Sequence, residues 1–143
     1  MFCRWRHRPR TVLHVTRDRI VGIIIGSVAF VCAHGFITSA WLRATLTPDP
    51  MIRPWFTNSS RSVLLTAVVV GLAAFAWALS AMDRRSALAR GVTVGVGAMV
   101  AMLAVMSTIG IGTLGPIVFV IGGAILIAAG AAGASVASMF KPG

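Results

Sequence analysis

Charged side chains are scarce in this chain, and their scarcity separates it from soluble proteins. Only 11% of its 143 residues are charged, 57% are hydrophobic, and the mean hydropathy is +0.90. A soluble domain usually has about 25% charged residues. Glutamate does not occur at all, and two cysteines, Cys3 and Cys32, are too few for a disulfide framework. These absences exclude an ordinary soluble domain and a disulfide-stabilised secreted scaffold.

Four long stretches contain no Asp, Glu, Lys or Arg. They are residues 20–42, 62–82, 91–110 and 116–140. A helix rises about 1.5 Å per residue and the hydrocarbon core is about 30 Å thick, so about 20 apolar residues span a membrane. None of the stretches alternates polar and apolar residues as a transmembrane strand would. The sequence therefore predicts an all-α integral membrane protein with four transmembrane helices in one membrane domain, residues 20–140.

Basic residues are distributed unevenly between the connecting segments. Residues 1–19 contain six arginines, residues 83–90 contain three, and the tail 141–143 contains Lys141, whereas residues 43–61 contain three arginines. Because basic residues accumulate on the cytoplasmic side, both termini and segment 83–90 are predicted to be cytoplasmic. Segment 43–61 becomes an extracytoplasmic loop. The abundance of Arg, Ala, Val and Gly suggests a GC-rich bacterial genome, and hence the bacterial inner membrane.

The last two apolar stretches are joined by a short apolar connection. It reads Gly-Ile-Gly-Thr-Leu-Gly-Pro over residues 110–116. Glycine permits the positive φ angles of a sharp reversal, and proline suits the first turn of a helix. The sequence predicts a tight antiparallel hairpin of these two helices.

The N-terminal tail, residues 1–19, allows two interpretations. It can lie on anionic lipid headgroups, where each basic residue contributes about 1 kcal/mol near the surface. It can also be a docking arm for an acidic partner or RNA. Basic tails beside a first span commonly serve topology, so the lipid interpretation is favoured and no nucleic-acid partner is predicted.

Small residues at helical spacing are the clearest internal pattern. Their side chains let helix backbones approach closely, either within the bundle or against a partner or a second copy, and both alternatives stay open. The candidate interaction residues are Gly22, Gly26, Gly91, Gly95, Ala124, Ala128, Gly130 and Ala132. In loop 43–61, Pro50, Trp55 and Phe56 either pin the loop to the membrane surface or form a recognition surface for an extracytoplasmic partner.

No residue set points to catalysis. The three aspartates are scattered along the chain, and no carboxylate pair, metal cluster or phosphate-binding loop is present in the sequence. We therefore predict no enzyme activity, no catalytic or metal-binding residues and no cofactor. His34 is the one imidazole inside an apolar stretch and remains a speculative ligand. A neutral His34 bonded to Thr38, Ser39 or a neighbouring helix is favoured over a cofactor shared with a partner.

In size and topology the chain is similar to small four-span multidrug exporters. Their exchange relies on a glutamate in the first membrane helix, and this sequence has none. The predicted function is instead that of a non-catalytic accessory or scaffold subunit that binds other membrane or envelope proteins, with self-association as one form. The alternatives are a small oligomeric channel or transporter component and, third, a haem-associated respiratory subunit.

Overall fold

The structure, a computed structural model, describes residues 9–46, 59–109 and 115–141. Within these ranges all regular structure is helical and no strand occurs. The helices are α1 (Pro9–Leu46), α3 (Ser59–Leu79), α4 (Arg84–Ile109) and α5 (Gly115–Ser138). Each contains a segment long and apolar enough to cross a membrane: Thr16–Ala40, Ser62–Leu79, Arg84–Thr108 and Phe119–Ser138. The predicted all-helical fold with four candidate membrane helices is confirmed, and the chain has the character of a multi-pass membrane protein.

Two helices extend further than the apolar stretches indicate. Residues 9–19, predicted as a tail, belong to α1, and residues 84–90, predicted as a loop, form the first two turns of α4. Hydropathy marks the part of a helix that lies in lipid and stops at the first charge. Arginine and alanine are good helix formers, so the backbone hydrogen bonds continue past that point. With 38 residues, α1 is about 57 Å long, well beyond the hydrocarbon thickness.

The connection between α3 and α4 is correspondingly short, residues 80–83. Asp83 caps α4: its carbonyl accepts the Ala87 N–H at 3.0 Å, and its own N–H donates to the Ser86 hydroxyl at 3.4 Å. The Ser86 hydroxyl donates in turn to the Asp83 carboxylate, and this hydrogen bond is the main cause that lowers the pKa of Asp83. A negative charge at this position also complements the helix dipole.

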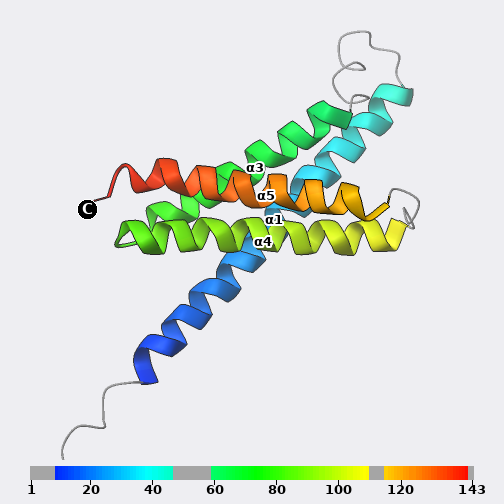
Figure 1. The fold of residues 1–143 in the computed structure, drawn as a ribbon. Coiled ribbons are helices and arrows are strands. Elements are labelled where there is room, and N and C mark those ends of the chain that lie inside the picture. The colour runs from blue at the N-terminus through cyan, green and yellow to red at the C-terminus, as the bar shows by residue number, and fades with distance from the viewer. Residues whose placement is uncertain (1–8, 47–58, 110–114, 142–143) are drawn as a thin grey trace, which may run out of the picture.

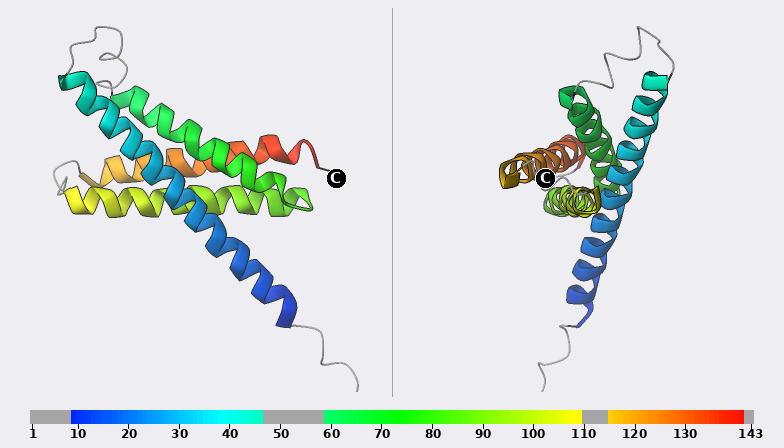
Figure 2. Two further views of the ribbon diagram at one scale, coloured as in Figure 1. Left: turned by 180° about the vertical axis from the view of Figure 1, so that it is seen from behind. Right: turned by 90° about the vertical axis from the view of Figure 1, so that its right-hand side faces the viewer.

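The helices form a bundle in which one member is strongly inclined. The helices α4 and α5 lie side by side and run in opposite directions, and α3 packs against both (Figure 1). The helix α1 crosses α4 and continues beside α3, and its N-terminal half points away from the rest of the bundle (Figures 1 and 2). We call the end that holds the α3–α4 connection the tight end, and the end that holds the start of α3 the open end.

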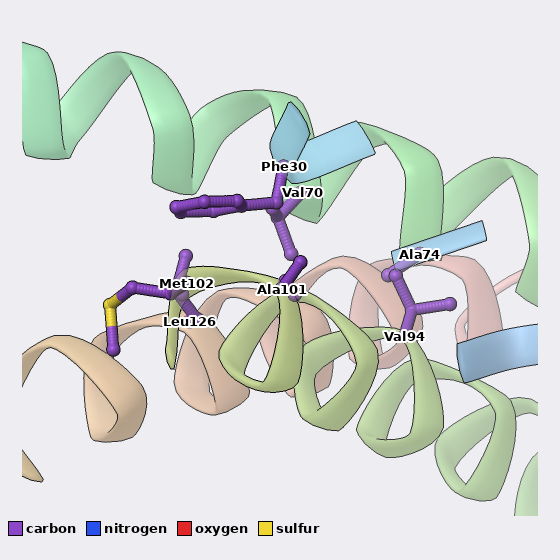
Figure 3. Close-up of a cluster of buried hydrophobic side chains, with 8 residues drawn as sticks. Phe30, Val70, Ala74, Val94, Ala101, Met102 and Leu126 are labelled. Atoms are coloured by element: carbon purple, nitrogen blue, oxygen red, sulfur yellow. The ribbon is translucent and has the colours of Figure 1, made fainter. Parts of the chain in front are cut away.

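The buried side chains differ between these two ends. Toward the tight end the core is made of five alanines: Ala78, Ala81, Ala87, Ala134 and Ala137. Toward the open end it also contains larger side chains, those of Phe30, Val70, Val94, Met102 and Leu126, beside Ala74, Ala98 and Ala101. Figure 3 shows Phe30, Met102 and Leu126 gathered on one side of this second cluster. Small side chains let helices approach closely, so these alanines allow close packing of α3, α4 and α5 at the tight end.

Candidate functional site

Three glycines bring α1 and α4 into close contact, and two of them meet the backbone of the other helix. A Cβ on Gly26 would overlap the carbonyl of Val94, and one on Gly97 would overlap the carbonyl of Ile23. A Cβ on Gly22 would overlap the side chain of Thr93. Glycine is therefore required here, because only its missing side chain lets the two helices cross at this distance.

The Ser27 hydroxyl strengthens the same crossing, since it donates to the carbonyl of Gly97 at 3.0 Å. A hydrogen bond of this kind between helices contributes about 1 kcal/mol in a membrane. At the crossing itself, α1 and α4 are thus held by close approach of the backbones and by the Ser27–Gly97 hydrogen bond.

Glycines also mediate the packing of α5. Gly91 of α4 and Gly130 of α5 face each other so closely that a Cβ on either would overlap the backbone carbonyl of the other. A Cβ on Gly95 would come within 2.7 Å of the Ile127 Cα. All five predicted glycines contact other helices of the bundle, as the close-packing alternative expects. They are Gly22, Gly26, Gly91, Gly95 and Gly130.

The predicted alanines behave differently. Ala124, Ala128 and Ala132 are all exposed, and they form a line of small side chains along α5. We call these three residues the α5 stripe. The other predicted candidates, Pro50, Trp55 and Phe56, lie outside the described residues.

At the open end the helices border an open-sided cavity of about 410 Å³. It is bounded by residues of all four helices, among them Phe30, His34, Thr66, Met102, Met106 and Gly122. We call it the open-end cavity. Its walls are mostly apolar, and their polar groups are the His34 imidazole and the hydroxyls of Ser62 and Thr66. The volume and this sparse polarity match those of small-molecule pockets in general.

His34 is held by stacking rather than by a hydrogen bond. Its ring lies parallel to that of Phe30, with centroids 5.8 Å apart and an angle of 6° between the planes. Neither ring nitrogen has a hydrogen-bond partner in the described part of the chain. The favoured bond to Ser39 is not formed, because the Ser39 hydroxyl donates to the carbonyl of Phe36 at 2.9 Å, as serines in helices commonly do. Both nitrogens are therefore available to a ligand.

A network around Arg90 joins three helices at the tight end. Its guanidinium donates to the Asp18 carboxylate of α1 through Nη2 at 2.7 Å and Nε at 3.2 Å. Nη1 donates to the Ser80 hydroxyl at 2.6 Å, and the guanidinium lies 4.7 Å from the centre of the Trp77 ring. The side chain of Arg90 is only 16% exposed. No sequence pattern indicates this pair, because its members are 72 positions apart.

Beside this network lies a second gap, of about 300 Å³, between α1 and α4. It opens because α1 diverges from α4 beyond their glycine contact (Figures 1 and 2). We call it the polar groove, and it is lined by Asp18, Arg19, Arg85, Ser86, Ala89, Arg90 and Thr93. Three arginines therefore share this space with one aspartate.

The described residues contain no group of three or more His, Cys, Asp or Glu side chains that could hold a metal ion. Comparison of the chain with protein-family models, with curated proteins and with solved structures finds no match. The function is therefore argued from the geometry of the chain itself.

Proposed function

We propose that this chain is a non-catalytic accessory or scaffold subunit of the bacterial inner membrane that binds a helix of another membrane protein through the α5 stripe. In this proposal the N- and C-termini face the cytoplasm and α4 and α5 form a tight antiparallel hairpin. The bilayer is its solvent, and nucleic acid is not a partner.

The observation that carries the proposal is the exposure of Ala124, Ala128 and Ala132. The glycine faces are filled by contacts within the bundle, whereas these three side chains contact no other helix closely enough to be covered. In lipid, helices associate by close packing rather than by the hydrophobic effect, and a line of small residues provides the closest approach. The stripe is thus suited to a second helix.

The distribution of charge supports the proposed orientation. The tight end carries four basic residues, namely Arg84, Arg85, Arg90 and Lys141. Arg43 lies near the C-terminal end of α1, toward the open end. Because basic residues accumulate on the cytoplasmic side, the tight end is assigned to the cytoplasm. The opposite directions of α4 and α5 are consistent with a hairpin.

The test is purification in mild detergent of the wild type, of Ala128→Leu and of the matched control Ala104→Leu, which makes the same change at an exposed position of α4. We expect the wild type to retain a partner that binds again when both proteins are purified and reconstituted. Ala128→Leu should weaken that binding about tenfold, or about 1.4 kcal/mol, and the control should not. Self-association abolished by the same variant would assign the stripe to a second copy. Equal binding by all three proteins would contradict the proposal.

The open-end cavity favours a second candidate function, that of a small channel or transporter component. An apolar cavity with one available imidazole suits a lipid-soluble solute that carries a single polar group. This function predicts flux in proteoliposomes of the chain alone, with loss of flux in His34→Ala. Absence of solute flux in these proteoliposomes would contradict the channel or transporter function. The haem alternative predicts a Soret band in the purified complex.

A further inference from the structure

We propose that the polar groove binds the phosphate of an anionic phospholipid, with Arg19 of α1 and Arg85 of α4 as its ligands. This inference does not depend on the α5 stripe. It also differs from the general attraction predicted for residues 1–19, because it places one headgroup between two named helices.

The polar groove has an excess of positive charge. Arg90 is paired with Asp18, so these two charges neutralise each other. Arg19 and Arg85 are both exposed, and within the described ranges neither forms an ion pair. Two guanidinium groups that form no ion pair therefore line one gap of about 300 Å³, and Arg85 has only a weak electrostatic interaction with the Asp83 carboxylate. The planar guanidinium matches phosphate oxygens with paired hydrogen bonds, so the groove is suited to a phosphate.

The other polar groups of the groove already have hydrogen-bond partners within the protein. The Thr93 hydroxyl donates to the carbonyl of Arg90 at 2.7 Å, and the Ser86 hydroxyl donates to Asp83. The Arg90 guanidinium is fixed by Asp18, by Ser80 and by the face of Trp77. Arg90 is therefore a positioning residue, which holds α1 against α4, while Arg19 and Arg85 supply the binding charges.

The polar groove lies near the ends of the apolar segments of α1 and α4. The apolar segments of α1 and α4 begin at Thr16 and Arg84, so Arg19 and Arg85 lie close to one membrane boundary. Lipid phosphates occupy this level. Further into each helix the exposed side chains are apolar, including Ile20 and Ile24 on α1 and Val92 on α4. A lipid fits both features, since its phosphate meets the arginines and its acyl chains meet these side chains. Free phosphate would use only the first.

The experiment measures lipid binding to the full chain in detergent. Native mass spectrometry and thermal unfolding are recorded with phosphatidylglycerol and with phosphatidylcholine of identical acyl chains. The test variant is Arg19→Gln/Arg85→Gln. The matched control is Arg17→Gln/Arg84→Gln, which removes the same charge from the same helices, within two positions of Arg19 and Arg85, but not from the groove lining. Arg85→Lys keeps the positive charge but loses the planar guanidinium that forms paired hydrogen bonds with phosphate oxygens.

We expect the wild type and the control to bind phosphatidylglycerol at least tenfold more tightly than phosphatidylcholine, with a higher midpoint of unfolding. The test variant should lose this preference, and Arg85→Lys should retain part of it. An equal loss in both double variants would overturn the proposal, because it would reflect surface charge alone. Absence of any preference in the wild type would also overturn it.

A third arm separates the two sources of phosphate. Inorganic phosphate and glycerol phosphate are added at millimolar concentration without anionic lipid. We expect them to shift the unfolding midpoint far less than phosphatidylglycerol does. A full shift with either small anion, abolished in the test variant, would overturn the lipid assignment and identify a site for a soluble phosphate. None of these results depends on a protein partner, so the proposed accessory role stands or fails separately.

Discussion

The open-end cavity and the polar groove lie on opposite sides of one helix crossing. Two straight helices that touch at a point must separate in both directions, and the glycine contact between α1 and α4 is such a point. On one side the gap is lined mainly by apolar groups with a single imidazole, and on the other by arginines and an aspartate. One packing contact thus produces two cavities whose chemistry is set by the residues that happen to border each gap.

The two gaps also differ in how the protein holds the polar side chain that borders each of them. In the polar groove, Arg90 is tied to Asp18, Ser80 and Trp77, so its charge is compensated. In the open-end cavity, His34 is stacked on Phe30 and has no hydrogen-bond partner among the described residues. The first arrangement stabilises the bundle, whereas the second leaves a polar group ready for a ligand.

The largest effect on stability is expected at the α1–α4 crossing, which separates the two gaps. Gly26→Ala should destabilise the protein by about 3 kcal/mol, because its Cβ would overlap the backbone of Val94 and force α1 away from α4. Gly35→Ala is the matched control on the same helix. Nothing lies within 4 Å of a Cβ at Gly35, so that change should stabilise the protein by up to about 1 kcal/mol. Thermal unfolding in detergent measures both, and equal effects would contradict the crossing.

The next largest effect is confined to the polar groove. Arg90→Gln should lower stability by about 2 kcal/mol, because it removes the pair with Asp18 and the contact with the Trp77 ring. Arg84→Gln is the control, since Arg84 makes one weak hydrogen bond, to the Lys141 carbonyl at 3.4 Å. Unfolding midpoints that fall equally for both would mean that the network does not link the helices.

A smaller effect of opposite sign is expected in the open-end cavity. His34→Phe keeps an aromatic ring beside Phe30 but removes two nitrogens that lack protein partners. Stability should therefore rise by about 1 kcal/mol, since the cost of an unsatisfied polar group disappears. The same variant should abolish any solute binding in the cavity. A fall in stability, measured by thermal unfolding, would show that the imidazole is bonded after all.

The smallest effect concerns pH at the tight end. Because the Ser86 hydroxyl lowers the pKa of Asp83, this cap stabilises the protein above the ordinary aspartate pKa and loses its effect as pH falls through the lowered value. The midpoint of unfolding of Ser86→Ala should thus lie below that of the wild type at pH 6, and this difference should narrow as the pH is lowered below the ordinary aspartate pKa. If the difference in midpoint between the two proteins did not depend on pH, the Asp83 carboxylate could not be the cause of the stabilisation.

The number of membrane helices was predictable, and their ends were not. Four runs free of charge are long enough to span a membrane, and the structure has a helix over each. Hydropathy does not register that α1 starts at Pro9 and α4 at Arg84, because helix formation at the charged ends depends on backbone hydrogen bonds rather than on lipid.

The candidate site was predictable in part. His34 stood out because it is the one imidazole in an apolar run, and the structure places it at a cavity. The partners of Arg90 were not predictable, since Asp18 and Trp77 reach it only through the arrangement of α1 and α3. Small residues were recognised as packing positions, but their spacing could not show that Gly130 faces inward while Ala128 is exposed.

The sequence by itself determined that this chain forms apolar helices of membrane-spanning length and that few polar groups lie within them. That information is local, because length and composition decide how a segment partitions between water and lipid. Only the tertiary structure decided which small residues are buried, which remain on the surface and which side chains border each gap. The reason is geometric: close contact at Gly26 sets the path of α1, and that path brings residues far apart in the sequence into one site.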